Sequence, residues 1–79
     1  MVVSAYTLIR TKHYKRDQLV NKIKNLRHVK EVASVYGEYD IVVRTETDSL
    51  EELTLFIYTK LRKIRGLTAT TTMITLHKR

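Results

Sequence analysis

The chain has 79 residues, no cysteine and a formal net charge of +7 at pH 7. A domain of this length buries only about 60% of the surface of its unfolded chain, and without cysteine it gains no disulfide or thiolate-bound zinc. We therefore expect oligomerisation to stabilise it. No apolar run approaches the roughly 20 residues that span a bilayer, and the N-terminus lacks a secretory signature. These features indicate a cytoplasmic protein without membrane contact.

Two strands and a helix are predicted in the first half of the chain. Residues Val2–Ile9 are rich in β-branched and aromatic side chains, which favour a strand. A helix is expected over Arg16–Leu26, because apolar residues recur there along one helical stripe. These residues are Leu19, Val20, Ile23 and Leu26. A second strand is expected from His28 to Tyr36.

The second strand is predicted to reverse in a tight turn at Gly37 and Glu38, because glycine adopts a positive φ without steric cost. A third strand then runs from Tyr39 to Thr45. The turn region contains Tyr36, Glu38, Tyr39 and Asp40. This mixture of rings and carboxylates suits a small polar ligand. On the alternative interpretation, the tyrosines simply pack and the carboxylates are solvated.

A second helix is predicted between residues 48 and 65. Ser49 followed by Glu52 fits a capping box, and apolar residues then recur at helical spacing. Those residues are Leu50, Leu53, Phe56, Ile57, Leu61 and Ile64. Gly66 ends the helix. A last strand is expected over Leu67–His77, because its threonine-rich start favours extended backbone.

The predicted order of elements is β-α-β-β-α-β, and the two halves align on each other, with Leu19 matching Ile57 and Arg27 matching Arg65. This duplication predicts an α+β, ferredoxin-like fold, in which both helices cover one face of a four-stranded antiparallel sheet. The first and third strands carry apolar residues on both faces. We therefore expect a second subunit to cover the free face, sheet against sheet.

No catalytic or metal site is indicated. The histidines are His13, His28 and His77. None has a nucleophile near it in sequence, and each is interpreted as a solvated surface residue. The only glycines, Gly37 and Gly66, cannot form a phosphate-binding or dinucleotide-binding loop. A metal at Glu38 and Asp40 lacks the support of histidine spacing. We therefore expect a protein that is not an enzyme and needs no metal or cofactor.

The positive charge raises one alternative, a basic nucleic-acid-binding or architectural protein. The charge is uneven, since seven of the eight carboxylates lie within residues 31–59 beside one base, Arg44. The segment from Tyr36 to Val43 also has an acid where an RNA-recognition motif stacks a base, and that acid would repel RNA phosphates. The alternative would use Lys12, Lys15, Arg16, Lys60, Arg62 and Lys63.

Four segments of the chain share a residue pattern with a known family. The first is Val-x-x-Val-x-x-x-x-Gly-x-Tyr-Asp, from Val29 to Asp40. The others are Asp48-Ser49-Leu50-x-x-Leu53-x-x-Phe56-Ile57, Leu61-x-x-Ile64-x-Gly66-Leu67 and Thr70-x-Thr72-x-Ile74-x-Leu76. Over essentially the whole chain, the pattern resembles the effector domain of the leucine-responsive/asparagine-operon (Lrp/AsnC) transcription regulators, also called the RAM domain.

The resemblance implies a ferredoxin-like subunit that dimerises through its sheet and assembles further. It also implies that amino-acid effectors bind between dimers, beside the loop that joins the second and third strands. The implied effector-binding residues are Tyr36, Gly37, Glu38, Tyr39, Asp40, Thr70 and Thr72. Asp40 or Glu38 would bind the effector's ammonium group, and the N–H groups of the glycine turn would bind its carboxylate.

Regulators of this family carry an N-terminal helix-turn-helix DNA-binding domain, whereas the first strand expected here starts at Val2. We therefore expect residues 1–79 to form a single, stand-alone effector domain without a helix-turn-helix domain. The expected function is amino-acid-dependent assembly in the regulation of transcription of amino-acid metabolism. Full-length relatives are possible partners for co-assembly, and no direct DNA contact is expected.

Overall fold

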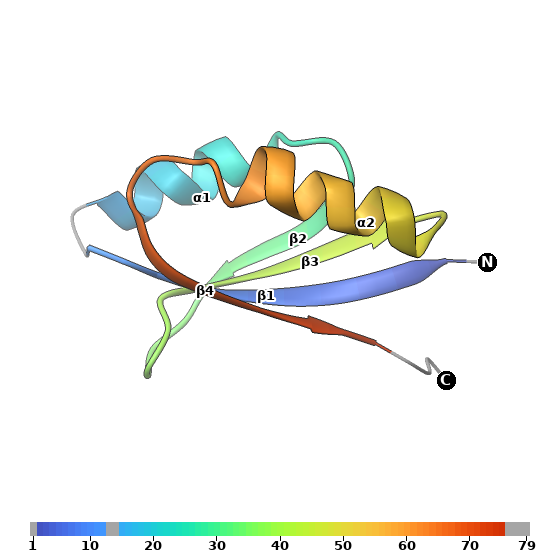
Figure 1. The fold of residues 1–79 in the computed structure, drawn as a ribbon. Helices are drawn as coiled ribbons and strands as arrows, with labels where there is room; N and C mark the ends of the chain where they lie inside the picture. Colours follow the sequence, from blue (N-terminus) through green and yellow to red (C-terminus); the bar gives the residue numbers. More distant parts are fainter. Residues whose placement is uncertain (1, 13–14, 76–79) are drawn as a thin grey trace.

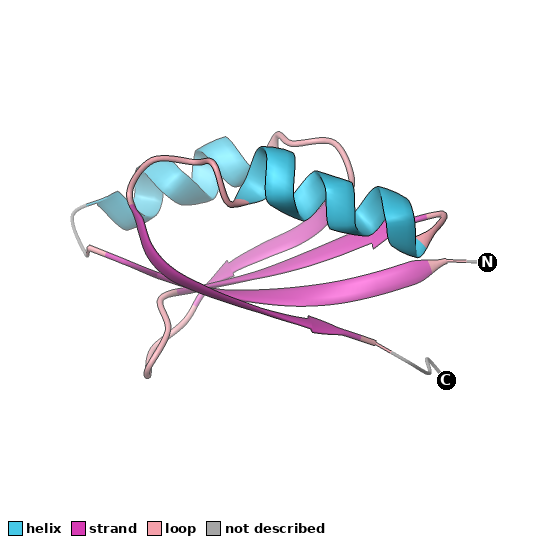
Figure 2. Cartoon of the chain, viewed as in Figure 1, coloured by secondary structure: helices cyan, strands magenta, loops and turns pink. Residues whose placement is uncertain are grey.

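One antiparallel sheet, covered on one face by helices, forms the domain (Figure 1) in a computed structural model that describes residues 2–12 and 15–75. The strands are β1 (Val3–Thr11), β2 (Val29–Ser34), β3 (Ile41–Thr47) and β4 (Leu67–Ile74). The helices are α1 (Arg16–Lys24), α2 (Leu50–Phe56) and its π-helical continuation η2 (Ile57–Leu61). The strand order is β2-β3-β1-β4. This arrangement confirms the predicted α+β, ferredoxin-like fold (Figure 2).

The core lies between the helices and the sheet. Alternate residues of a strand point to opposite faces, and in β3 the predicted alternation is observed, with Ile41 and Val43 buried and Val42 on the other face. The buried apolar residues are Ala5, Ile9, Leu19, Ile23, Ile41, Val43, Leu53, Phe56, Ile57 and Leu61. They come from β1, β3 and all the helical segments, and α1 lies mainly over β2, whereas α2 lies over β3 and β1.

The predicted cap starts α2, because Ser49 Oγ accepts a hydrogen bond from the Glu52 backbone N–H at 3.1 Å. Ser49→Ala is expected to lower the free energy of unfolding by about 1 kcal/mol, since it removes the acceptor of a free N–H group in the first turn. Ser49→Gly should cost only a few tenths of a kcal/mol. Urea denaturation measures both variants, and equal losses would contradict the capping role.

The second helix departs from the regular α-helix that the sequence predicts. Beyond Phe56 it widens into a π-turn, closed by a hydrogen bond from the Arg62 N–H to the Ile57 carbonyl at 2.9 Å. The buried residues Leu53, Ile57 and Leu61 are each four residues apart, and in an α-helix such a row drifts by about 40° per step. One wider turn cancels this drift, so Leu61 stays buried in the core.

Several predicted boundaries move by two residues or more. β2 ends at Ser34 rather than Tyr36, β3 spans Ile41–Thr47 rather than Tyr39–Thr45, and the second helix ends at Leu61 rather than near residue 65. β1 continues past Ile9 to Thr11, and it pairs there with β4 across a β-bulge. α1 ends at Lys24 rather than Leu26, because the chain then tightens into turns and His28 adopts a φ of 77°. This left-handed conformation directs the chain into β2.

The predicted tight reversal at Gly37–Glu38 is wrong. Residues 35–40 separate β2 from β3 and form a wider loop, which is closed by a hydrogen bond from the Val35 N–H to the Asp40 carbonyl at 2.9 Å. The loop is wide because the Asp40 N–H donates to the Ile9 carbonyl of β1 at 2.8 Å instead of extending the β2–β3 ladder. Its glycine takes a φ of 136°, so the reversal still depends on glycine.

Candidate functional site

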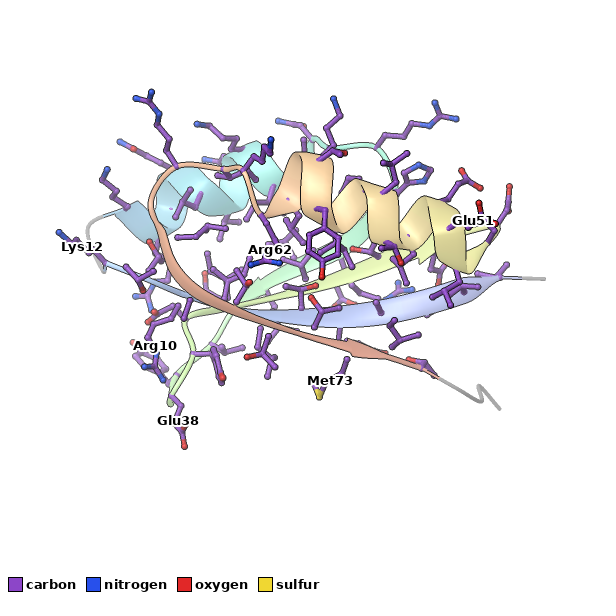
Figure 3. The ribbon with its side chains drawn as sticks, viewed as in Figure 1. Arg10, Lys12, Glu38, Glu51, Arg62 and Met73 are labelled. Atoms are coloured by element: carbon purple, nitrogen blue, oxygen red, sulfur yellow. The ribbon has the colours of Figure 1, made fainter. Side chains whose placement is uncertain are left out.

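A groove lies between the second helix and the edge strand β4, and we call it the β4 groove. Its volume is about 410 Å³. It is lined by Thr54, Ile57, Tyr58 and Arg62 from the helical side and by Thr70, Thr72 and Ile74 from β4. Figure 3 shows the Arg62 side chain between the helix and the sheet. The groove therefore combines one cation with hydroxyl groups and apolar walls.

The β4 groove is suited to a small anion. Among the described residues that line it, Arg62 is the only charged one, and its guanidinium carbon lies 5.0 Å from the centre of the Tyr58 ring. Such stacking orients a guanidinium, whose planar N–H fork binds a carboxylate through two parallel hydrogen bonds. Thr72 Oγ1 lies 3.1 Å from Thr7 Oγ1 on the neighbouring strand, so the groove floor also offers hydroxyl groups.

The π-turn determines which helical side chains reach this groove. The Arg62 N–H bonds to the carbonyl five residues earlier, one residue further back than in an α-helix. Side chains after the turn are therefore rotated backwards relative to a regular helix. This rotation lets Tyr58 and Arg62 border the groove together, and π-turns frequently occur at functional sites.

The 35–40 loop projects from the sheet on the side away from the helices (Figure 1), but the Tyr36 ring at its start lies 5.9 Å from the guanidinium carbon of Arg16 in α1. Arg10 of β1 holds the loop, since Arg10 Nε donates to the Glu38 carbonyl at 2.8 Å. The Arg10 guanidinium carbon also lies 5.3 Å from the centre of the Tyr39 ring. The Tyr39 hydroxyl is 3.1 Å from Thr71 Oγ1 of β4. Contacts with two strands thus fix the position of the loop.

The two predicted carboxylates of the loop have different environments. Asp40 is only 9% exposed, and its Oδ2 accepts a hydrogen bond from the Thr11 backbone N–H at 2.9 Å. This carboxylate therefore satisfies a buried backbone donor at the irregular end of β1. Glu38 is exposed and extends away from the sheet in Figure 3. Of the two acids, Glu38 is the one that a ligand can reach.

The predicted site residues do not come together within one subunit. Thr70 and Thr72 lie on the helix side of β4, where they line the groove, whereas the 35–40 loop lies on the other face. Thr71, between them in sequence, contacts Tyr39 of the loop instead. Successive residues of a strand alternate between faces, so the threonine run is divided between the two regions.

Several residues of these regions were not predicted as effector contacts, and four of them carry polar groups that bear on the site. They are Arg10, Thr54, Tyr58 and Arg62. The sequence assigns Arg62 only to the nucleic-acid alternative. A usable signal was present, because Thr54, Tyr58 and Arg62 recur every four residues on the polar side of the helix.

The face of the sheet opposite the helices is partly apolar, as predicted for the second faces of β1 and β3. Its apolar side chains include Tyr6, Leu8, Val42 and Met73, which are paired across neighbouring strands as Tyr6 with Met73 and Leu8 with Val42. Tyr6 is 39% exposed and Met73 50%. The sheet also carries a cluster of charged residues, in which the Arg44 guanidinium pairs with the Glu46 carboxylate at 2.6 Å and with the Glu31 carboxylate at 3.4 Å.

His28, the one histidine among the described residues, has no contact that indicates catalysis. His28 packs edge-on against Phe56, with ring centres 5.6 Å apart, and its Nε2 lies 4.0 Å from a Glu52 carboxylate oxygen, so it is less solvated than predicted. His13 and His77, with the predicted end of the last strand, lie outside the described residues. Within residues 2–12 and 15–75, no group of three or more potential metal ligands exists. Over the same residues, no helix combines the length and apolar character that crossing a bilayer requires.

The bases of the nucleic-acid alternative do not form one surface. Arg62 lines the β4 groove, whereas Lys60 lines a different groove, between the second helix and the turn after α1. Lys12 lies at the end of the molecule where β1 stops (Figure 3). The predicted basic set is therefore dispersed over several parts of the domain.

The sequence matches the family model described as the Lrp/AsnC ligand binding domain over residues 4–79. Among curated proteins, it is 34% identical over 74 residues to the HTH-type transcriptional regulator FL11 from Pyrococcus furiosus. That alignment covers 94% of this chain and 48% of the relative. The chain thus spans about half the length of the curated relative that it matches.

Solved structures share the fold. The hypothetical protein PHS023 from Pyrococcus horikoshii is 39% identical and superposes with a TM-score of 0.89, over 96% of this chain and 92% of that chain. AsnC from E. coli is 23% identical, with a TM-score of 0.87 over 96% of this chain and 52% of that chain. The family is a ligand-binding domain of transcription regulators rather than an enzyme family, which agrees with the prediction from the residues. On its sequence pattern, its fold and these matches, the chain belongs to the Lrp/AsnC ligand-binding domain family.

Proposed function

We propose that this 79-residue module by itself binds an amino acid and, by amino-acid-dependent assembly, takes part in regulating transcription of amino-acid metabolism in the cytoplasm. The observation that carries the proposal is a pair of complementary half-sites on opposite faces of the sheet. The β4 groove offers a cation, Arg62, and the 35–40 loop offers an exposed acid, Glu38. A zwitterion needs both charges, so it binds where the loop of one subunit meets the groove of another.

In this shared site, each charged group of the amino acid finds an opposite charge. Arg62 binds the carboxylate, and Glu38 of the neighbouring copy binds the ammonium group through charge-assisted hydrogen bonds. The hydroxyl groups of Thr70 and Thr72 contact the ligand from the groove floor. Asp40 contributes indirectly, because its bond to the Thr11 N–H anchors the loop. The backbone N–H groups near Gly37 are further donors for the carboxylate.

Assembly begins with a dimer formed through the free face of the sheet. The exposed apolar side chains of Tyr6 and Met73 support this step, because a small domain gains stability by burying such a face against a second copy. The dimer would leave the β4 groove accessible on the helix side. Further copies can then bring their 35–40 loops to the grooves.

The amino acid controls the assembly because its affinity for the higher assembly differs from its affinity for the separate dimer. A ligand that contacts both half-sites binds the higher assembly more tightly than the separate dimer, and it shifts the equilibrium by that difference alone. Full-length regulators that carry the same domain are candidate partners for co-assembly, which the 34% identity to the Pyrococcus furiosus regulator supports. The module would thereby influence transcription without touching DNA itself.

The test is calorimetric titration of the chain with each of the twenty common amino acids, with light scattering on the same samples. We expect at least one amino acid to bind and to change the molecular mass. Glu38→Gln should lose this binding while keeping its fold, because it removes only the exposed charge. If no amino acid binds and the mass never changes, the proposal fails. Tight, steeply salt-dependent binding of duplex DNA would instead favour the nucleic-acid alternative.

A further inference from the structure

A second groove lies on the helix layer, where the turn after α1 passes beside the second helix (Figure 1), and we call it the α1-turn groove. Its volume is about 470 Å³, which is within the range of small-molecule sites. One wall is formed by residues 25–28 of the turn. The other wall is formed by Glu52, Leu55, Phe56, Thr59 and Lys60 of the second helix. The amino-acid site of the proposed function uses none of these residues.

The middle of the α1-turn groove is apolar. Leu26 of the turn is half-buried, and Leu55 of the second helix is 64% exposed. Phe56 is only 6% exposed, and the ring of His28 packs edge-on against it. An apolar group that covered the Leu55 side chain would remove its apolar surface from water, which is favourable. The groove therefore suits the apolar part of a ligand.

The walls of the groove are held in place by hydrogen bonds within the subunit. The His28 carbonyl accepts from the Glu46 N–H of β3 at 3.0 Å, which fixes the turn on the sheet. The side chains of Asn25 and Thr59 donate to backbone carbonyls of their own helices, at 3.0 Å and 2.6 Å. A ligand therefore meets a preformed groove, in which these two polar side chains already have partners.

The charged rim of the groove is mainly basic. Lys60 and Arg27 border it from opposite walls, and both are exposed. In the part of the chain that the structure describes, neither of them makes an ion pair. The one acid on the described rim, Glu52, has a carboxylate oxygen 4.0 Å from His28 Nε2. Glu52 also precedes Lys60 by eight residues, a rise of about 12 Å along a helix, so it does not neutralise Lys60.

We propose that the α1-turn groove binds a monocarboxylate that has an aromatic or branched apolar body and no ammonium group. The carboxylate pairs with the Lys60 ammonium group through charge-assisted hydrogen bonds. Arg27 adds positive charge from the facing wall. The apolar body packs against Leu55 and Leu26, so each part of the ligand meets a wall of matching character.

The missing ammonium group separates this ligand from the amino acid of the proposed function. In an amino acid the ammonium and carboxylate groups are attached to the same carbon atom. An ammonium group would therefore also lie beside Lys60, where like charges repel. Glu52 is too far along the helix to compensate this repulsion. The groove thus distinguishes a carboxylic acid from the amino acid of the same carbon skeleton.

The test compares 3-phenylpropionate with phenylalanine, because the two differ only in the ammonium group. Nuclear magnetic resonance shifts of the Leu26 and Leu55 methyl groups and of the His28 ring report binding in the groove itself. We expect 3-phenylpropionate to shift these signals and to saturate at millimolar concentration, as small fragments do. Phenylalanine should require about tenfold more or beyond. Unchanged signals with 3-phenylpropionate, or equal affinity for the two compounds, overturn the proposal.

Two exposed lysines provide matched variants for the charge. Lys60→Gln should weaken the binding of 3-phenylpropionate about fivefold to tenfold, because it removes the partner of the carboxylate. Lys63→Gln removes an equal charge from an exposed position three residues further on. It should change the affinity by less than about twofold, since Lys63 is not among the described residues that line the groove. Equal losses for the two variants show a general effect of charge and overturn the proposal.

An apolar variant tests the contact with the body of the ligand. Leu55→Ser should weaken the binding of 3-phenylpropionate about threefold or more, because it removes apolar surface that the ligand covers. The fold should be retained, since Leu55 is 64% exposed. An unchanged affinity would contradict the proposed position of the ligand. All these signals come from the α1-turn groove, so their outcome is independent of whether an amino acid binds at Arg62 and Glu38.

Discussion

Asp40→Ala is expected to lower the free energy of unfolding by about 1.5–3 kcal/mol, the typical loss for a hydrogen bond to a charged acceptor. The variant leaves the Thr11 N–H without its acceptor, and Thr11 is only 6% exposed. Urea denaturation followed by circular dichroism measures the loss. The sequence alone favours a direct role of Asp40 in ligand binding, whereas its buried contact favours a role in holding the loop on β1.

Two further variants separate stability from charge. Asp40→Asn retains an oxygen that can accept from the Thr11 N–H, so it should lose clearly less stability than Asp40→Ala. Glu38→Ala, on the exposed part of the same loop, should change the stability by less than about 0.5 kcal/mol. If Asp40→Ala is as stable as the unaltered chain, its carboxylate does not fix the loop.

Arg62→Ala is expected to weaken amino-acid binding by about tenfold to a hundredfold, which corresponds to about 1.4–2.8 kcal/mol. Within residues 2–12 and 15–75, the variant removes the one charged side chain that lines the β4 groove, and a charge-assisted hydrogen bond contributes an energy of this size. Calorimetry with the amino acid that binds the unaltered chain most tightly measures the loss. Stability should change little, because the Arg62 side chain is exposed.

The control for Arg62 is Arg65→Ala, which removes an equal charge from an exposed position beyond the second helix. It should reduce the affinity by less than about twofold, since Arg65 does not line the groove. Arg62→Lys should recover only part of the affinity, because an ammonium group lacks the planar fork of a guanidinium. Equal losses for Arg62→Ala and Arg65→Ala would show a general effect of charge and remove Arg62 from the site.

Most of the fold could be predicted because its signals are local. Leu19 and Ile23 repeat at helical spacing and are buried, and Ser49 caps α2 through Glu52, as the residue types require. The alternation in β3 likewise follows from residues a few positions apart. Each of these features depends on neighbours in sequence, so one chain suffices to recognise it.

The features that escaped prediction depend on distant contacts. The 35–40 loop is wide because Asp40 bonds to Ile9 and Thr11 of β1, which no pattern around residue 40 reveals. The π-turn follows from the packing of Leu61 on the sheet, while the sequence spacing fits an α-helix nearly as well.

The candidate site was predicted in part. The loop residues and two threonines were named, but their separation onto opposite faces depends on the strand register, in which Thr72 pairs with Thr7 and Thr71 with Leu8. A shift of one residue would exchange these faces. Arg62 was not recognised as a groove residue, because its spacing from Thr54 and Tyr58 places the three on one side of the helix but does not show that β4 lies beside that side.

The wide turn in the second helix also has a genetic consequence. The wide turn contains one residue more than an α-helix would need to place the same side chains in the core. Deletion of a single codon within η2 would therefore convert the turn into a regular α-helix. The loss of one residue and the closure of the wide turn rotate the later side chains by about 100° in opposite directions, so Leu61 would stay in the core and Arg62 beside the β4 groove. Leu53 and Phe56, which precede the turn, would keep their packing. A single codon is therefore the difference between the wide turn and a regular helix, and its loss or gain would leave the fold and the groove residues outside the turn in place.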